Sequence, residues 1–272
     1  MQTKVIEKTG KWQVLNVKEL WQYRDLLKIL AERDIRLRYK QTALGFIWAI
    51  LQPLIPSLIF TIIFGMFAKM PSNGNHYMIF VFCGTMIWNL FAHSIDRGGN
   101  SIVNNERLIS KVYFPRILIP FSSLGAVFFD FIITSVLLVI LMFIFKVHPT
   151  LQLFSAPFFL LLALMTAAGI SLWLSALNVK YRDFMYAAPF IIQIWLYSTP
   201  VVYSSSIVPA KYQWIYSINP AVGFVEGFRW AILGTSSITS AMVIISTISA
   251  VVLLITGVVF FKSMERQFAD II

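Results

Sequence analysis

Charged residues are scarce in this chain. Asp, Glu, Lys and Arg together make up 12% of its 272 residues, about half of the roughly 25% that soluble domains carry. Hydrophobic residues make up 58%, and the mean hydropathy is +0.76. This composition excludes a soluble globular domain and predicts an integral membrane protein.

Cysteine and histidine are also rare. The one cysteine, Cys83, lies in a predicted membrane span, and a single cysteine excludes an intramolecular disulfide. The three histidines, His76, His93 and His148, are isolated and lie near the ends of predicted spans. We interpret them as side chains at the membrane interface, and we expect no metal site.

Sequence motifs for catalysis are missing as well. The chain has no G-x-x-x-x-G-K-[ST] phosphate loop, no H-E-x-x-H zinc pair and no G-x-S-x-G nucleophile elbow. We therefore expect neither a catalytic residue nor a cofactor in this chain. Any uphill transport must draw its energy from elsewhere.

Ionisable groups are nearly absent from the middle of the predicted spans. Asp130 is the one acid deep inside a span, whereas a proton-coupled pump usually carries several ionisable groups at such depth. The carboxyl of Asp130 either contacts a Ser, Thr or Trp side chain of a neighbouring helix, which we favour, or lines a polar path. A proton-coupled pump is thus a poor match.

Long apolar stretches dominate what is present. About 20 apolar residues cross the roughly 30 Å hydrocarbon core as a helix, and six stretches qualify, of which the fifth is marginal in length. They are residues 43–68, 77–95, 117–145, 153–177, 186–202 and 238–261. Residues 1–41 are polar and lack the apolar core of a signal peptide, so we expect the first span to stay in the mature protein.

The distribution of Lys and Arg predicts the orientation of the spans. Eighteen of the 22 lie in the N-terminal segment, in the loops 96–116 and 178–185, and in the tail after residue 261. The alternate connections hold the other four: Lys69, Lys146, Lys211 and Arg229. Because positive loops stay inside, both termini are expected in the cytoplasm. The net charge of +10 then follows from topology, and we expect no nucleic-acid partner.

These observations predict an all-α integral membrane protein in three parts. Residues 1–42 form a cytoplasmic N-terminal segment, residues 43–261 a six-helix transmembrane domain, and residues 262–272 a cytoplasmic tail. Within the transmembrane domain, residues 205–234 form an external re-entrant region between spans five and six.

The segment before the first span predicts an amphipathic helix. Asn16 is a plausible N-cap, and Glu19 three residues later makes a capping-box variant. Helical spacing then separates two faces. The apolar face contains Leu20, Tyr23, Leu27, Leu30 and Ala31, and the polar face contains Asp25, Lys28, Glu32, Arg36 and Lys40. Such a helix lies in the membrane interface, where its polar face meets lipid alone or also docks a soluble partner.

The loop "NNERLISKVYFPR" predicts a second, shorter helix. Asn104 or Asn105 can cap about two turns that run through Lys111, and Pro115 ends them because proline lacks an N–H and restricts the residue before it. A short rigid helix at this position lets a partner that moves it also move the two flanking spans. The alternative is that the segment is merely an ordered connection. The short loop "NVKYRD" could make a second, smaller contact.

Aromatic residues and prolines are concentrated in the spans. Phe, Tyr and Trp make up 15% of the chain. Such rings form interfacial belts, pack against other helices, or line a pore and offer an apolar surface to the C–H faces of sugars. Pro53, Pro56 and Pro200 free backbone carbonyls that need partners in protein or water. Spans one and five are therefore either pore-lining or simply kinked.

The stretch "NPAVGFVEGFRWAILG" is too short to cross the membrane. Asn219 suits an N-cap, Pro220 the first helical position and Gly234 a C-terminal stop. The 14 residues between the caps measure about 21 Å at about 1.5 Å per residue. With a shorter helix at 209–217, they predict two half-helices that enter from the external face, in preference to a flat surface hairpin. Glu226 and Arg229 can pair across one turn and position a gate.

Five motifs in order resemble one family. The strings "ERDIRLRYKQTALGFIWAILQPL", "SKVYFPRILIP", "LSALNVKYRDF", "YSTPVVYSSSIVP" and "NPAVGFVEGFRWAILG" are similar to the membrane permease of ABC-2 type polysaccharide exporters, which move O-antigen and teichoic acid. The resemblance runs from about residue 12 to residue 261. It implies a homodimer in the bacterial inner membrane with two copies of a separate ATPase, which binds ATP and Mg. The implied substrate is an undecaprenyl-pyrophosphate-linked glycan.

The resemblance also assigns roles to residues. Contact with the ATPase is expected at Asp25, Glu32, Arg36, Glu106, Arg107, Leu108, Lys111 and Tyr113. The pyrophosphate is expected to enter near Arg36, Arg38 and Lys40, for which snorkelling or contact with lipid phosphate is the alternative. Channel-lining aromatics are expected to be Phe46, Trp48, Phe60, Phe64, Trp195, Tyr197 and Tyr203. The periplasmic gate is expected at Asn219, Pro220, Glu226, Arg229 and Trp230.

Two other classes fit less well. A membrane enzyme of lipid-linked glycan assembly needs acids or bases clustered at one membrane face, but Asp130, Asp183 and Glu226 lie in three different topological positions. An ion channel or secondary transporter is disfavoured by the lack of intramembrane charge.

Overall fold

The computed structural model describes residues 21–40, 45–235, 238–265 and 268. Every regular element in these ranges is helical. The main helices are α2 (Arg24–Tyr39), α3 (Ile47–Phe60), α4 (Tyr77–Asn104), α5 (Glu106–Ile109), α6 (Leu118–Ile144), α7 (Ala156–Lys180), α8 (Phe184–Tyr197), α9 (Gln213–Tyr216), α10 (Pro220–Leu233) and α11 (Ser240–Met264). Shorter pieces are η1 (Thr61–Phe67), η2 (Leu151–Ser155), η3 (Ser205–Ile207) and η4 (Ala210–Tyr212).

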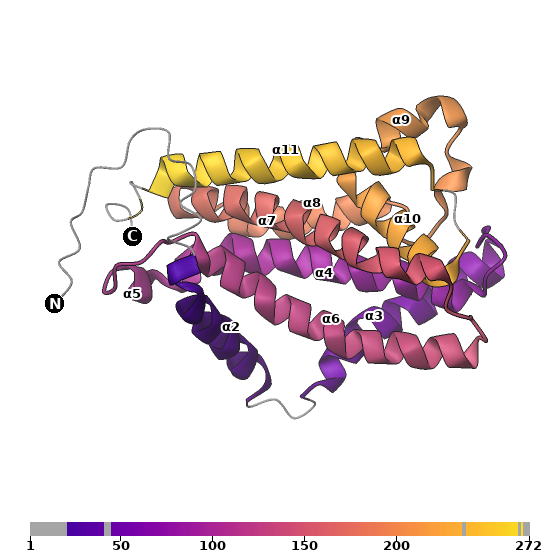
Figure 1. Ribbon diagram of the computed structural model, residues 1–272, viewed down its shortest axis with the longest axis horizontal. Coiled ribbons are helices and arrows are strands. Elements are labelled where there is room, and N and C mark those ends of the chain that lie inside the picture. The colour runs from indigo at the N-terminus through magenta and orange to yellow at the C-terminus, as the bar shows by residue number, and fades with distance from the viewer. Residues whose placement is uncertain (1–20, 41–44, 236–237, 266–267, 269–272) are drawn as a thin grey trace.

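The long helices run side by side along the longest axis of the molecule (Figure 1). At one end, the α5 end, lie α2, α5, the start of α6 and the last turns of α4, α7 and α11. At the other end, the α9 end, lie η1, α9 and the start of α11. α10 lies within the bundle, where it packs against α4, α7 and α11.

In the part of the chain that the structure describes, five helices are long and apolar enough to cross a membrane. They are α3 with η1, α4, α6, η2 with α7, and α11. The fifth predicted span, residues 186–202, is wrong as a single long helix: α8 has 14 residues, and the chain turns after Tyr197. Pro200 has no N–H to continue the helical hydrogen bonds, and residues 199–202 fold into a buried turn.

The second predicted span is longer than expected. α4 runs to Asn104 instead of ending at residue 95, and so it includes Asp96 and Arg97. Gly98 and Gly99 do not break the helix because they accommodate α7. A Cβ at Gly98 would lie 2.6 Å from Ser171, and one at Gly99 would lie 3.0 Å from Leu174. The absence of a side chain thus serves close helix packing.

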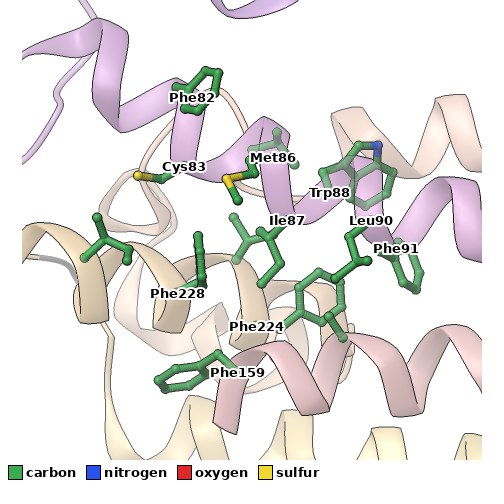
Figure 2. Packing of buried hydrophobic residues seen from close by; sticks show 14 of the residues in the cluster. Phe82, Cys83, Met86, Ile87, Trp88, Leu90, Phe91, Phe159, Phe224 and Phe228 are labelled. Atoms are coloured by element: carbon green, nitrogen blue, oxygen red, sulfur yellow. The ribbon is translucent and has the colours of Figure 1, made fainter. Parts of the chain in front are cut away.

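The central helix of the bundle is α4. In its most apolar stretch 83% of the residues are buried, whereas the share is 17% in α3 with η1. Figure 2 shows Phe224 and Phe228 of α10 pointing toward α4. The ring centroids of Phe224 and Phe91 are 5.1 Å apart, within the range of favourable aromatic pairs.

A carbonyl freed by a proline and the hydroxyl of Ser57 join α3 to its neighbouring helices. Pro53 cannot donate to the carbonyl oxygen of Ala49, and the hydroxyl of Thr134 in α6 donates to that oxygen instead, at 3.0 Å. The hydroxyl of Ser57 donates to the carbonyl of Pro53 at 2.6 Å and lies 2.7 Å from the hydroxyl of Thr85 in α4. These bonds join α3 to both neighbours, as buried polar groups require.

The two predicted faces of α2 are confirmed where they are described. Leu30 is buried and Tyr23, Leu27 and Ala31 are partly buried, whereas the polar-face residues are exposed. The apolar face packs against α6. The predicted cap at Asn16, with Glu19 and Leu20, lies outside the described residues.

Gly227 of α10 provides the first test. The ring of Phe159 in α7 covers this glycine, and an added Cβ would lie 2.0 Å from the ring. We expect Gly227→Ala to lower the free energy of unfolding by about 1–3 kcal/mol because the packed ring must move. The measurement is the apparent melting temperature in detergent, with Ala241→Leu at an exposed position of α11 as control. An unchanged melting temperature for Gly227→Ala would contradict this packing.

Candidate transport sites

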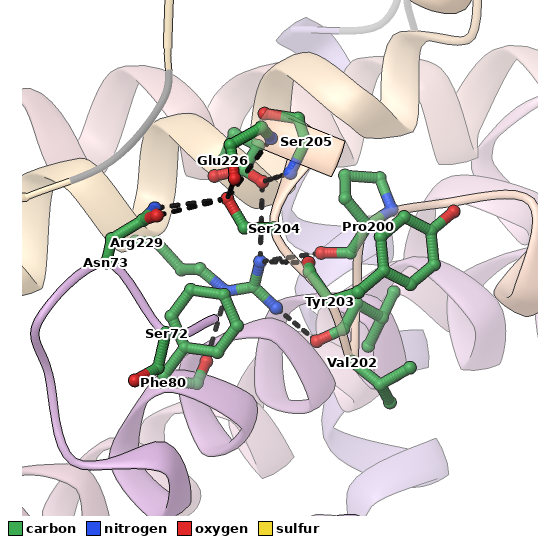
Figure 3. Close-up of polar contacts among 12 residues, drawn as sticks. Ser72, Asn73, Phe80, Pro200, Val202, Tyr203, Ser204, Ser205, Glu226 and Arg229 are labelled. Atoms are coloured by element: carbon green, nitrogen blue, oxygen red, sulfur yellow. Dashed lines mark hydrogen bonds and ion pairs between the residues drawn. The ribbon is translucent and has the colours of Figure 1, made fainter. Parts of the chain in front are cut away.

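Arg229 of α10 is fully buried and hydrogen-bonded to backbone carbonyls (Figure 3). Its Nε donates to the carbonyl oxygen of Phe80 at 3.0 Å. One Nη donates to those of Pro200 at 2.6 Å and Tyr203 at 3.2 Å, and the other Nη donates to that of Val201. Because the chain leaves the helix after α8, these last three carbonyls lack helical donors. The guanidinium, with five N–H groups, takes the place of those donors.

Glu226 completes this cluster from the same helix face. Its Oε1 lies 3.6 Å from a guanidinium nitrogen of Arg229, which confirms the predicted pairing. The same oxygen accepts a hydrogen bond from the backbone N–H of Ser205 at 2.8 Å. Gly84 leaves room for the guanidinium, since a Cβ there would lie 2.4 Å from it. The pair therefore binds α10 to α4 and to the segment that follows α8.

Asn219, just before α10, is hydrogen-bonded to α8 and to the turn that follows α8. As predicted, it is the N-cap, and its Oδ1 accepts from the N–H of Ala221 at 3.0 Å. The same oxygen accepts from the indole N–H of Trp195 at 2.9 Å, and its Nδ2 donates to the hydroxyl of Thr199 at 3.0 Å. Pro220 is the first helical residue, and Gly234 ends the helix with φ 74°. Both predicted ends of α10 are confirmed.

The last predicted gate residue lies on the α7 side of α10. Trp230 is partly buried, and its ring is 6.5 Å from that of Phe159 in an edge-to-face arrangement. All five predicted gate residues are thus gathered on α10 or at its first turn.

The seven predicted channel aromatics divide into two groups. The first group lies on α3 and η1. Phe46 and Trp48 are about half exposed, and the ring centroids of Phe60 and Phe64 are 5.9 Å apart. Around the end of α8 lie Trp195, Tyr197 and Tyr203. The Tyr203 hydroxyl bonds to the carbonyl of Tyr197 at 3.2 Å and lies 2.9 Å from the hydroxyl of Tyr216. In the second group, the Tyr203 hydroxyl thus contacts Tyr216, which precedes α10.

Asp130 has a different partner from the one expected. Its carboxylate forms an ion pair with Arg38 and accepts a hydrogen bond from the Tyr39 hydroxyl, both on α2, instead of contacting a Ser, Thr or Trp side chain. Burial and the Asp130 carboxylate raise the pKa of Tyr39. A small cavity of about 20 Å³, lined by Gln52, His93 and Asp130 among others, adjoins the ion pair. Its volume suffices for about one water molecule.

The three basic residues expected near the substrate differ in exposure and in their partners. Arg38 is held by Asp130, and its other Nη donates to Gln52 at 3.3 Å. Arg36 is exposed and lies 3.7 Å from Glu32, and Lys40 is exposed. Arg36 and Lys40 present their charge at the surface, whereas Arg38 fixes the end of α2 to α6.

The predicted two-turn helix after α4 is wrong in length. α5 has four residues and ends at Ile109, before Lys111. Asn105 occupies the N-cap position, but its side chain does not cap the helix. It accepts a bond from Arg33 of α2 at 2.8 Å and donates to the carbonyl of Ser101 at 2.8 Å. The short helix is thereby joined to α2, which sequence alone did not indicate.

The predicted ATPase-contact residues lie at the α5 end. Most are exposed: Asp25, Glu32, Arg36, Glu106, Arg107, Lys111 and Tyr113; Leu108 is partly buried. The α5 end thus offers a surface of mixed charge.

Comparison with known proteins decides the family. The protein-family model described as ABC-2 type transporter matches residues 25–233.

The chain belongs to this family.

Relatives of this ABC-2 family member carry a more specific name. Two proteins from Klebsiella pneumoniae, each named O-antigen export system permease protein RfbA, are 26% and 28% identical to it over 249 residues. Each alignment covers 91% of this chain and 95% of the relative. A protein of the same name from Myxococcus xanthus is 28% identical over 257 residues, covering 93% and 98%. The ABC-2 family member is a multi-pass protein of the bacterial inner membrane.

The ion pair between Arg38 and Asp130 provides the second test. Asp130→Asn leaves the guanidinium partly buried without its counter-charge, so we expect the free energy of unfolding to fall by about 2 kcal/mol. Thermal unfolding in detergent measures it. Arg36→Gln, on the exposed face of the same helix, should change stability little. Additive effects of Arg38→Gln and Asp130→Asn in a double-mutant cycle would contradict the coupling.

Proposed function

We propose that this chain is the permease subunit of an ATP-driven exporter of undecaprenyl-pyrophosphate-linked O-antigen. The observation that carries the proposal is the alignment of three proteins named O-antigen export permeases over 91–93% of the chain. Teichoic acid and capsular glycan are the alternative substrates, because lipid-linked glycans share the same carrier chemistry.

The topology proposed is six spans with both termini in the cytoplasm. α8 and the buried turn after it form the short fifth crossing, with the Arg229 guanidinium satisfying the carbonyls that the turn frees. The α5 end then faces the cytoplasm, which agrees with the excess of Lys and Arg there. α10 enters the bundle from the periplasmic side, whereas α9, none of whose residues is buried, stays at that surface instead of forming the first of the two predicted half-helices. The burial of 13 of the 14 residues of α10 supports this placement over a surface hairpin.

The pathway proposed lies between two copies of the chain. α3 with η1 is the least buried of the five candidate spans, and in α8 only Ala188 is buried. Both helices pack on α4 and expose large apolar side chains. Opposed in a homodimer, they would enclose a channel with Phe46, Trp48 and Tyr197 on its wall. Apolar rings offer sugar faces a surface without strong hydrogen bonds.

The ATPase is proposed to dock at α2 and α5. ATP and Mg²⁺ bind to that separate subunit, in two copies per dimer. The bond between Arg33 and Asn105 supports a common movement of the two helices, and α5 continues directly from α4. The exposed Arg36 and Lys40 would meet the pyrophosphate of the entering substrate, while Arg38 holds α2 to α6.

A membrane enzyme is the competing class. Among the described residues, no three His, Cys, Asp or Glu side chains gather as a metal site would require. Asp130 is engaged with α2, Glu226 with Arg229, and Asp183 lies just before α8. This separation supports transport over catalysis.

Reconstitution tests the proposed function. Inside-out vesicles that contain the permease and its ATPase should take up undecaprenyl-pyrophosphate-linked O-antigen when ATP is added. Vesicles with a hydrolysis-deficient ATPase serve as the control. Uptake of a teichoic acid or capsular precursor instead would identify the alternative cargo. Export that persists in cells after deletion of the ATPase would refute an ATP-driven exporter.

The gate provides a further prediction. Arg229→Lys retains the charge, but a lysine ammonium cannot replace a guanidinium that bonds to several carbonyls at once. We expect a pore leak, measured by dye release from vesicles that contain the permease, and reduced export. Glu226→Ala should also leak, because Arg229 then lacks its counter-charge. If single alanine variants of both residues leave leak and export unchanged, the gate role fails.

A further inference from the structure

The last turn of α11 is bonded to the connection between α5 and α6. The backbone N–H of Arg116 donates to Oε1 of Glu265 at 3.1 Å, and the Arg116 guanidinium donates to the backbone carbonyl of Glu265 at 2.6 Å. Lys262 holds the other carboxylate oxygen at 2.7 Å. Figure 1 shows α5 and the end of α11 at the same end of the bundle.

Apolar contacts reinforce this connection. Phe268 is fully buried, and its ring lies 5.4 Å from that of Phe261. It belongs to the same buried cluster as Ile109, the last residue of α5, and Phe114. Phe268 also forms one wall of a cavity of about 400 Å³, whose other walls come from residues 109–114 and 116. The segment after α5 therefore rests on the end of α11.

The bond to Glu265 stabilises a position that has no helical partner. Arg116 lies between Pro115, which interrupts the preceding turn, and the first turn of α6, where the N–H groups of Leu118 and Ile119 donate to the carbonyls of Pro115 and Arg116. A carboxylate near a helix N-terminus is favourable, and bonds to an ionised acceptor are stronger than neutral ones. Glu265 thus fixes the angle at which the chain enters α6.

At its other end, α11 contacts α10. A Cβ at Gly223 of α10 would lie 2.3 Å from the side chain of Ser246. The Ser246 hydroxyl donates to the carbonyl of Ser217 at 3.0 Å, just before α10. Along its length α11 also touches α7 closely, since a Cβ at Gly257 would lie 2.3 Å from the carbonyl oxygen of Gly169. One helix therefore contacts both the α5–α6 connection and the start of α10.

We propose that Glu265 and Phe268 are positioning residues that couple α5 to α10 through α11. They hold residues 110–116 against α11, so that a displacement of α5 moves α11 in addition to α4 and α6. This inference rests on the proposed function in one respect, namely that the ATPase displaces α5. The anchoring itself is a property of the permease alone.

Hydrogen exchange tests the anchoring without the ATPase. In peptides that cover residues 110–117, Glu265→Ala should raise the backbone exchange rate about tenfold, because a charge-assisted bond is lost. Glu265→Gln keeps an acceptor oxygen for the Arg116 N–H and should restore most of the protection. Lys262→Met removes the neighbouring ion pair but not the Arg116 bonds, and it should behave like the parent protein. Parent-like exchange in Glu265→Ala would overturn the anchoring.

Coupling is tested in the complex with the ATPase. Glu265→Ala and Phe268→Ala should keep ATP hydrolysis but lower the amount of glycan exported per ATP several-fold. Glu265→Gln and Phe268→Leu should restore the export per ATP. Parent-like export per ATP in both alanine variants would overturn the positioning role. Absence of ATP-driven export in the parent complex itself would refute the proposed function and leave the exchange result to decide the anchoring.

Discussion

The α9 end of this protein depends on the contacts of one guanidinium. Arg229 satisfies the carbonyls of Pro200, Val201 and Tyr203 after α8 and that of Phe80 in α4. Inside a membrane, where water cannot replace a lost partner, irregular backbone persists only when protein groups bond to it. Glu226 keeps the charge compensated. The same cluster therefore stabilises the break after α8 and the buried position of α10.

Close helix packing gives the rest of the bundle its shape. Glycines let α4 approach α7, and α10 approach α7 and α11. α4 is enclosed by α6, α7 and α10, while α3 and α8 remain on the outside with large apolar surfaces. At the α5 end, an ion pair joins α2 to α6, and a hydrogen bond joins α2 to Asn105, just before α5. A third hydrogen bond joins Arg116, just before α6, to Glu265 at the end of α11. A movement at that end therefore has several physical routes to α10.

The features that the sequence predicted correctly are those that local sequence signals determine. The caps of α10, the start of α4 and the two faces of α2 follow from cap residues and hydrophobic periodicity, and the structure confirms them. Contacts between distant residues were not predictable: Asp130 meets Tyr39 across 91 positions, and Arg116 meets Glu265 across 149. The predicted length of α8 was wrong because the hydropathy stays high through Val202, whereas the helix ends at Tyr197, before Pro200. The pairing of Glu226 with Arg229 was predicted because both lie on one helix, but the carbonyls bound by Arg229 were not.

A cryo-electron microscopy structure of the permease with its ATPase is the decisive test of this arrangement. We expect two permease copies with α3 and α8 facing one another, the ATPase at α2 and α5, and α10 enclosed at the far end with the Arg229 guanidinium bonded to its carbonyls. An ATPase docked at the α9 end, or α3 and α8 facing lipid with no pathway between the copies, would contradict it.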